Sequence, residues 1–407
     1  MRSDMNTKYL TTEIAEAAEL LRGGGLVAVP TETVYGLACN GLDAEAVERV
    51  YEVKGRPAVK PLSLMVPGKE AMELYCEDVP EAAYRLAERF WPGPLTIVLK
   101  AKPEIPAIVR AGGETVGLRC PDHPLTLALL REAGVPFAAP SANPSGAPSP
   151  QTAQEVAGYF DGQIEAILDG GACTLGTEST LISLAQKPYR VLRQGALAAE
   201  TIAETLCEDM TLIGITGGSG SGKTTVLRLL EKRGALVIDC DALYHELLQT
   251  DTELLTALDA AFPGTVREGK LDRRALAAMV FSDPAKLKAL NGIAHRHIMA
   301  AVRERLRAHA MAGGTLAAVD AIELISSGLA EACDLTLAVT APRETRLARI
   351  MARDGLTRAE AEQRLNAQHE DTYFSDRCSA VLVNDGDEAA LTKQFNRLMK
   401  EKLGWTN

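Results

Sequence analysis

The chain has 407 residues, of which 46% are hydrophobic and 24% charged, and its formal net charge is −11 at pH 7. This length exceeds that of one typical core, so two domains of about 200 residues are expected in a protein of ordinary globular composition. The acidic balance argues against a protein that holds nucleic acid by bulk electrostatics, and we expect no stable nucleic-acid binding.

The eight cysteines are scattered, with neither a C-x-x-C pair nor zinc-ligand spacing. Reduced thiols in a cytosolic protein fit this pattern. The N-terminal segment lacks the apolar core of a signal peptide, and no apolar run approaches the length of a membrane span. We therefore expect a cytoplasmic protein without membrane association.

Short strands and helices interleave in the first half of the chain. Helices are predicted over 13–22, 46–53, 82–90 and 126–132, and strands over 26–29, 64–66, 95–100, 116–121, 137–139, 164–168 and 179–184. The elements lack the regular alternation of a doubly wound sheet. The fold class expected here is a mixed α/β sheet curved around a cleft.

Polar side chains gather where these strands end. They are Thr33, Lys54, Arg56, Lys60, Arg119, Ser141, Asn143, Ser179 and Arg193, with Lys54 and Arg56 in a predicted basic loop over 54–57. Cations and hydroxyls with few carboxylates suit a pocket for a multiply anionic ligand. Each residue taken singly is more often a solvated surface group, so the residues alone predict an anion-binding cleft and nothing finer.

Five motifs go further: PTETVYGL at 30–37, KGRP at 54–57, FWPGPLT at 90–96, PSAN at 140–143 and GTEST at 176–180. In this order and spacing, residues 9–205 resemble the YrdC-type threonylcarbamoyl-AMP synthases. The resemblance implies a curved sheet with a basic cavity that uses L-threonine, bicarbonate and ATP. The implied products are threonylcarbamoyl-AMP and pyrophosphate. The former feeds tRNA threonylcarbamoylation through downstream transfer proteins.

The resemblance also implies residue roles. Arg56, Lys60, Ser141, Asn143 and Arg193 match positions around ATP, with Lys54 completing a K-x-R element; Thr33, Arg119 and Ser179 match the threonine side, with Thr115 nearby. Because carboxylated threonine and ATP bring several negative charges together, positioned cations such as Arg56 and Lys54 would supply most of the catalysis.

Departures from the synthase pattern are Met65, where histidine is common, and Gln194 within the usual Arg-Pro-Gly. We also expect the extra C-terminal domain of longer members to be absent, because a different domain follows directly after a boundary within 205–211.

The second half begins with a phosphate-binding motif. A predicted strand over 212–215 leads into G-x-x-x-x-G-K-[ST] over 217–224, and a helix is predicted over 226–232. In that context loop amides and the helix dipole cradle phosphate. ATP contacts are expected from Gly218, Gly220, Ser221, Gly222, Lys223, Thr224 and Thr225. Lys223 would reach the β/γ-phosphates and Thr224 would ligate Mg²⁺. A chance glycine-rich turn is the weaker alternative.

Further strands are predicted over 235–238, 316–319 and 335–339, and helices from 242, over 275–281, up to about 311 and over 343–353. Asp239 and Asp241 follow the first of these strands, at the ligand edge of a parallel sheet. One of them could cap the next helix, but capping does not explain both. Asp320 follows the second strand and is a candidate Mg²⁺ ligand.

Two further patterns concern histidines and arginines. His295 and His297 are two residues apart on a predicted helix and cannot face one metal, so we expect no zinc site. The arginines of the helix over 343–353 are either a solvated face or a group that closes over the transferring phosphate, and the pattern leaves both open.

The segments 217–225, 239–241, 271–273 and 290–291, with His295, 353–356, Gln368 and 384–386, make residues 211–400 resemble dephospho-CoA kinase. The resemblance implies ATP-dependent phosphorylation of the ribose 3′-hydroxyl of dephospho-CoA. Asp241 would be the base, with Asp239 and His295 on the substrate side and Arg349 and Arg353 in a mobile lid. The segment IELIS at 322–326 replaces a usual Pro-Leu-Leu-Phe-Glu, and Arg296 replaces a common proline.

The combined prediction is a bifunctional enzyme, with a synthase domain over 9–205 and a P-loop kinase domain over 211–407 that has a parallel sheet and helical substrate and lid regions. Three alternatives remain. The first half could be a non-catalytic RNA-binding module, which the net charge disfavours. It could also be a carbamoyltransferase, although the hydrogenase-maturation type adds cysteine-rich zinc segments that are missing here. The second half could phosphorylate another nucleoside-like hydroxyl.

Overall fold

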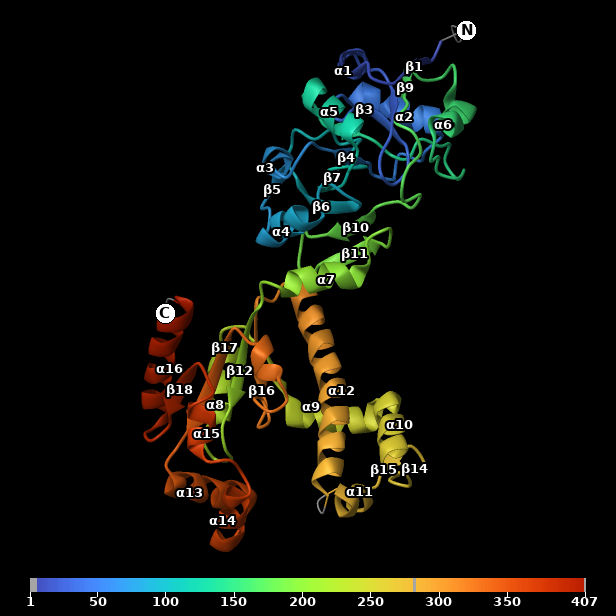
Figure 1. The fold of residues 1–407 in the computed structure, drawn as a ribbon. Helices are drawn as coiled ribbons and strands as arrows, with labels where there is room; N and C mark the ends of the chain where they lie inside the picture. The colour runs from blue at the N-terminus through green and yellow to red at the C-terminus, as the bar shows by residue number, and fades with distance from the viewer. Residues whose placement is uncertain (1–5, 281–282, 406–407) are drawn as a thin grey trace. The chain divides into compact units, whose positions relative to one another are not determined.

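The computed structural model describes residues 6–280 and 283–405 and divides into two compact units (Figure 1). The first unit consists of residues 1–208 and 311–313, and the second of residues 209–310 and 314–407. Among the described residues, no helix has the length and apolar composition required to cross a bilayer.

The first unit is built on one mixed sheet. Its helices are α1 (Ile14–Arg22), α2 (Ala44–Lys54), α3 (Ala71–Tyr75), α4 (Glu81–Phe90), α5 (Pro124–Ala133), α6 (Ala153–Phe160) and α7 (Ala199–Cys207). Its strands are β1 (Lys8–Leu10), β2 (Val27–Val29), β3 (Gly36–Asn40), β4 (Ser63–Met65), β5 (Cys76–Glu77), β6 (Leu95–Ala101), β7 (Thr115–Arg119), β8 (Phe137–Ala138), β9 (Ala166–Leu168), β10 (Thr180–Ser183) and β11 (Arg190–Arg193). The strand order is β1-β9-β2-β3-β8-β4-β7-β6-β10-β11, with β5 on β6, and the predicted mixed α/β fold is confirmed.

Apolar side chains from helices and strands form the core of this sheet. Leu21 of α1 and Leu129 of α5 are fully buried in one cluster with Val29, Phe137 and Leu168 from the strands, and α1 and α5 lie side by side (Figure 1). Burying each such side chain contributes about 1.5–3 kcal/mol. This packing holds the strand ends on which the polar residues stand.

The first unit departs from the sequence predictions at three places. Strand β3, for which no strand was predicted, begins at Gly36, and Gly36 pairs with Val29 in an antiparallel ladder. Lys54 does not belong to a basic loop but is the last residue of α2, because Gly55 at φ 57° provides the left-handed cap that ends the helix. Helix α6 was missed, although Thr152 and Glu155 form a capping box.

The second unit contains a five-stranded parallel sheet and a two-stranded hairpin. Its strands are β12 (Thr211–Thr216), β13 (Leu236–Asp239), β14 (Val266–Arg267), β15 (Lys270–Leu271), β16 (Leu316–Asp320), β17 (Leu335–Thr340) and β18 (Ala380–Val383). Its helices are α8 (Lys223–Glu231), α9 (Cys240–Thr250), α10 (Thr252–Ala261), α11 (Arg273–Val280), α12 (Pro284–Met311), α13 (Arg343–Asp354), α14 (Arg358–Asn366), α15 (Asp371–Ser375) and α16 (Glu388–Leu403), with the 3₁₀ helix η1 at Leu329–Ala332. The helix predicted over 275–281 is α11, and residue 281 lies outside the described residues.

The parallel sheet has the order β13-β16-β12-β17-β18. Its register places Asp239 of β13 opposite Asp320 of β16, and Asp320 opposite Ile215 of β12. The carboxyl ends of three neighbouring strands therefore meet at the phosphate-binding loop, as ligand sites of parallel sheets require.

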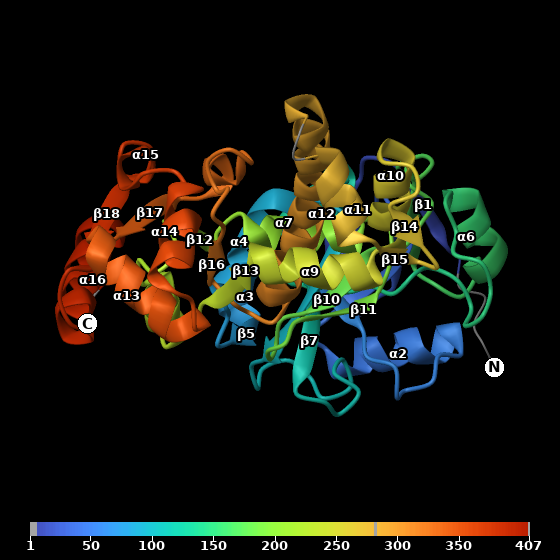
Figure 2. The same cartoon turned by 90° about the horizontal axis from the view of Figure 1, so that it is seen from below.

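Two helical groups extend from this sheet. Helix α10 packs with the β14–β15 hairpin and α11 around a cluster that includes Leu254, Leu258 and Phe262. Helices α13 and α14 lie side by side in both views (Figures 1 and 2) and share a separate small core around Leu347 and Ile350. Having its own core, the α13–α14 pair forms a compact part beside the sheet.

Candidate functional site

The first unit contains a cavity of about 200 Å³ at the ends of its central strands. Its polar lining is Arg56, Ser63, Thr96, Arg119, Ser141, Glu178, Ser179 and Arg193. Three guanidinium groups therefore stand against a single carboxylate. Arginine forms strong charge-assisted hydrogen bonds with carboxylates and phosphates, so this lining favours an anionic ligand.

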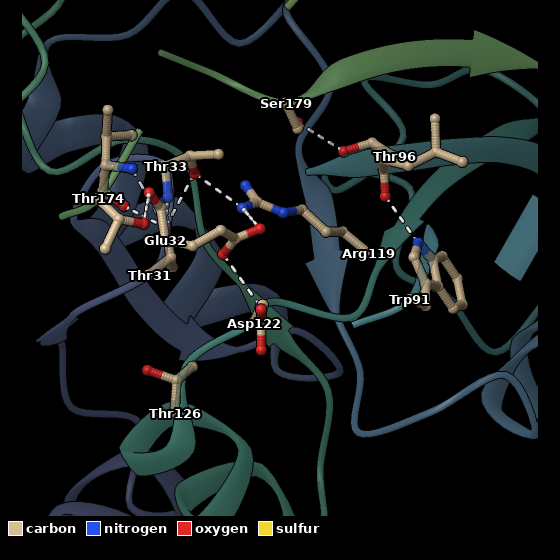
Figure 3. Close-up of polar contacts among 12 residues, drawn as sticks. Thr31, Glu32, Thr33, Trp91, Thr96, Arg119, Asp122, Thr126, Thr174 and Ser179 are labelled. Atoms are coloured by element: carbon tan, nitrogen blue, oxygen red, sulfur yellow. Dashed lines mark hydrogen bonds and ion pairs between the residues drawn. The ribbon is translucent and has the colours of Figure 1, made fainter. Parts of the chain in front are cut away.

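Arg119, the last residue of β7, is the most deeply set of these cations, with only 8% of its surface exposed. Its Nη2 donates to Glu32 Oε1 at 2.8 Å and to Thr33 Oγ1 at 2.7 Å (Figure 3). The structure thus joins Arg119 and Thr33, which the sequence placed together, and adds Glu32, which it did not single out.

Ser179 and Arg193 form a second polar group across the cavity. The hydroxyls of Ser179 and Thr96 lie 2.8 Å apart (Figure 3), and Arg193 donates to the backbone carbonyl of Ser179 at 2.8 Å. Arg193 also forms an ion pair with Glu178. Glu178, the carboxylate that lines the cavity, is therefore paired with Arg193, and a phosphate that binds Arg193 would compete with Glu178.

Lys54 does not line the cavity. Its side chain is buried, and its ammonium donates to the backbone carbonyls of Ser141 and Asn143. Burial lowers the pKa of Lys54 to about 8, the nearby Arg56 adds to this effect, and Glu178 opposes it. The ammonium therefore supports the loop that carries Ser141 and Asn143, and the catalytic role of Lys54 stays a prediction.

The remaining predicted residues lie at different depths. Arg56 is half-buried and donates to the carbonyl of Pro61 at 3.1 Å, while Lys60 is exposed on the same loop. Asn143 is buried and donates to Ala147, leaving its side-chain oxygen without a partner among the described residues. Thr115 begins β7, at the opposite end from Arg119, and does not line the cavity. Its assignment stays a prediction.

The second unit contains a cavity of about 640 Å³ around the phosphate-binding loop. Its lining is Gly218, Ser219, Gly220, Ser221, Gly222, Lys223, Thr224, Asp239, Asp241, Asp320, Ile322, Arg349, Ala352, Arg353 and Arg364. Lys223 donates to the carbonyl of Gly217 at 3.0 Å, and its Nζ lies 4.0 Å from Asp320 Oδ1. The structure thus brings most of the predicted kinase residues together, whereas Thr225 and His295 do not line this cavity.

Close neighbours explain the loop's glycines. A Cβ on Gly218 would lie 1.9 Å from Arg346 Nη2, and one on Gly222, whose φ is +106°, would lie 2.0 Å from Asn384 Nδ2. Asn384 Nδ2 also donates to the carbonyl of Ser221 at 2.8 Å. The carbonyl of Ser221 is therefore held by a side chain outside the loop. The amide of Ser219 donates to Gln368 and that of Ser221 to the carbonyl of Gly218, so a phosphate would be met by the other amides of the loop.

Asp239 and Asp241 have different roles in helix α9. Asp239 Oδ1 accepts from the amides of Asp241 and Ala242, each at 2.9 Å, so Asp239 is the N-cap. Asp241 stands in the first turn and turns to the cavity. Partial desolvation and the Asp239 carboxylate raise the pKa of Asp241, and Lys223 opposes them.

Asp320 and Ser221 bear buried oxygen atoms, Oδ1 and Oγ, that have no hydrogen-bond partner among the described residues. Burial, together with Asp239 and Asp241, raises the pKa of Asp320 to about 6 against the effect of Lys223. Thr224 is exposed at the same cavity. Buried oxygens without a hydrogen-bond partner and an exposed hydroxyl are the kind of ligands that a hard divalent cation prefers.

The arginines of α13 divide into two groups. Arg346 is buried, donates to the carbonyl of Ser219 at 3.0 Å and pairs with Asp371 at 2.7 Å. Arg349 reaches the carbonyl of Gly220 at 3.2 Å. Arg353 instead pairs with Asp354 at 2.7 Å, further along the helix. Arg346 and Arg349 thus bind the phosphate loop itself, and Arg349 and Arg353 also line the cavity.

Sequence reasoning missed Arg346 and Arg364 as individual site residues. The signal for Arg346 lay in the glycines opposite it, because a loop without Cβ atoms leaves room for a neighbouring side chain. Gln368, a motif residue, accepts from the amide of Ser219 at 2.9 Å. His297 pairs with Asp251 at 2.7 Å, which gives this histidine a structural partner.

Comparison with known proteins separates the two halves. Residues 19–195 match the Sua5/YciO/YrdC family profile, described as telomere recombination, and residues 211–390 match the dephospho-CoA kinase profile. A threonylcarbamoyl-AMP synthase of Pyrococcus abyssi is 47% identical over 48% of this chain and 58% of its own length. This chain spans 52–58% of the lengths of three threonylcarbamoyl-AMP synthases that it matches.

Two relatives are covered almost completely. A putative threonylcarbamoyl-AMP synthase of Mycobacterium tuberculosis is 35% identical over 48% of this chain and 90% of its own length. A dephospho-CoA kinase of Deinococcus radiodurans is 42% identical over 46% of this chain and 91% of its own length. Each match is confined to one half of the chain.

Proposed function

Residues 19–195 belong to the Sua5/YciO/YrdC family and residues 211–390 to the dephospho-CoA kinase family, and we propose that this chain unites a threonylcarbamoyl-AMP synthase with a dephospho-CoA kinase. The synthase domain is assigned to residues 9–205 and the kinase domain to residues 211–407. A cytoplasmic location is consistent with two ATP-consuming reactions.

The observation that supports the first activity is the cavity with three arginines. At neutral pH L-threonine carries a carboxylate, bicarbonate is itself an anion, and ATP carries a triphosphate. Arg119 would hold the amino acid, and Arg56 and Arg193 would hold the triphosphate. Attack of a carboxylated threonine on the α-phosphate would release pyrophosphate, and the arginines would stabilise the charge that develops there. The product would serve downstream tRNA-modifying proteins.

Arg56→Ala tests this proposal. Pyrophosphate release from ATP by the full chain should require both threonine and bicarbonate, and this variant should lower it at least about tenfold, because a charge-assisted phosphate contact is lost. A phosphate-release assay with added pyrophosphatase gives the rate, with Arg22→Ala, on the outer helix α1, as the matched control. Pyrophosphate release that continues without threonine would refute the synthase assignment.

The observation that supports the second activity is the meeting of Lys223, Asp241 and Asp320 at one sheet edge beside the phosphate loop. We propose that Asp241 accepts the ribose hydroxyl proton while the loop amides and Lys223 hold ATP. Thr224 and Asp320 would hold Mg²⁺, which when bound supplies charge neutralisation between the phosphates. Phosphorylation of the 3′-hydroxyl of dephospho-CoA is the proposed reaction, with Arg349 and Arg353 beside the transferring phosphate.

The two halves are expected to act independently. The halves coincide with the two compact units except for residues 311–313, which group with the first unit. Residues 1–208 and 209–407 expressed separately should therefore each retain kcat within about twofold of the full chain. Steady-state assays of both reactions on the separate and mixed halves measure this. A several-fold loss on separation that mixing restores would show instead that the activities depend on the junction.

A further inference from the structure

Glu32 is a buried carboxylate whose two oxygens are both occupied. Oε1 accepts from Arg119 Nη2 at 2.8 Å, and Oε2 accepts from the amide of Asp122 at 3.0 Å (Figure 3). Only 8% of the Glu32 surface is exposed, and Glu32 does not line the cavity. It therefore meets a ligand only through Arg119, which does line it.

The contacts of Arg119 leave part of its guanidinium unused. Both protons of Nη2 are committed, one to Glu32 and one to Thr33. The Nε atom is buried and has no partner among the described residues. Leaving a buried donor without a partner is destabilising, and Arg119 itself lines the cavity, so its spare donor capacity points to an acceptor supplied by a ligand.

The hydroxyl of Thr33 has no proton left to donate to a ligand. Thr31 Oγ1 spends its only proton on the carbonyl of Val34 at 2.6 Å, so the 2.9 Å contact between the Thr31 and Thr33 hydroxyls is donated by Thr33. With its proton committed, Thr33 is left as an acceptor for Arg119. The hydrogen bonds therefore lead from Arg119 to Thr33 and from Thr33 to Thr31. Within this group, Arg119 is the residue that can donate to a ligand.

We propose that Glu32 is a positioning residue for the amino-acid substrate. By holding Nη2, it fixes the orientation in which the guanidinium of Arg119 meets the carboxylate of L-threonine. This inference rests on the proposed synthase function and deepens it. Glu32 also carries a negative charge close to the bound carboxylate, so geometry and charge predict opposite effects when it is replaced.

Two substitutions separate these effects. Glu32→Gln removes the charge and, because an amide has a single acceptor oxygen, can satisfy only one of the donors on Arg119 and Asp122. Glu32→Asp keeps the charge but withdraws the carboxylate by one methylene. If geometry governs binding, both variants weaken threonine binding. If charge governs it, Glu32→Gln binds threonine more tightly than the wild type.

Glu165 provides a matched control in the same unit. One of its oxygens accepts from Arg49 at 2.7 Å and the other from the amide of Leu26 at 2.6 Å, so it has the same kinds of partner as Glu32. It does not line the cavity. Glu165→Gln should therefore report the cost of losing such a pair without an effect on threonine.

The experiment uses the full chain and two readouts. Calorimetric titration with L-threonine and with L-threoninamide, which lacks the carboxylate, gives affinities without turnover; pyrophosphate release gives KM for threonine and for ATP. In both Glu32 variants we expect threonine affinity and the preference over the amide to fall at least about tenfold, because a charge-assisted pair is misaligned. KM for ATP and melting temperature should change little relative to Glu165→Gln.

Unchanged or tighter threonine binding in Glu32→Gln would overturn the inference, and so would a joint change in both KM values that follows the melting temperature. A wild-type chain that binds threonine but releases no pyrophosphate would contradict the synthase activity alone and leave the binding comparison intact. A wild-type chain that binds no threonine would overturn both.

Discussion

Asp241→Asn is expected to lower kcat for CoA formation at least about a hundredfold, because general-base assistance is worth roughly 10²–10⁴ in rate. The ribose hydroxyl is too weak an acid to attack unaided, and we propose that the carboxylate of Asp241 takes its proton. The carboxylate lines the same cavity as Lys223. A coupled assay that follows ADP and CoA at saturating ATP and dephospho-CoA measures the effect.

The structure makes this substitution a clean test of chemistry. Asp239, not Asp241, caps helix α9, so Asp241→Asn should leave the melting temperature and ATP affinity near their wild-type values. Asp239→Asn is the matched control, because asparagine is as good an N-cap as aspartate. Near-normal turnover by Asp241→Asn, together with a large loss in Asp239→Asn, would transfer the role of base to Asp239.

Gly222→Ala is expected to weaken ATP binding at least about a hundredfold. The new Cβ would lie 2.0 Å from Asn384 Nδ2, so either the loop or Asn384 must move. Loss of two loop contacts to phosphate, at about 1.5–3 kcal/mol each, corresponds to this factor. Calorimetric titration of ATP into the full chain provides the measurement, and kinase turnover should fall with it.

Gly234→Ala separates the steric effect from backbone strain. Gly234 also has a positive φ, +83°, but a Cβ there would have no atom within 4 Å. Both variants bear the strain of a left-handed residue, about 1–3 kcal/mol, and only Gly222→Ala bears the clash. ATP affinity should therefore stay unchanged in Gly234→Ala. Equal losses of affinity in the two variants would show that the contact with Asn384 does not shape the loop.

The sequence alone predicted the features that depend on neighbouring residues. The strand, glycine loop and helix at 211–231 were predicted because glycine's conformational freedom and the adjacent apolar run act over a few residues. The mixed sheet of the first unit was predicted from the irregular interleaving of its strands and helices, and the parallel sheet of the second was expected as part of a P-loop kinase domain. The motifs also brought Arg119, Ser179 and Asp241 forward as candidates, and the structure places all three on cavity walls.

Contacts between distant residues were decided only by the tertiary structure. Glu32 meets Arg119 across 87 positions of sequence, and Arg346 meets Ser219 across 127. The K-x-R motif predicted that Lys54 lies near ATP. In the structure Lys54 is the buried last residue of α2, and its ammonium donates to the carbonyl of Ser141. Burial, ion pairing and hydrogen-bond direction depend on which segments the sheet register brings together, and that register is fixed by packing of the whole core, because a one-residue slip would turn every side chain of a strand to the other face.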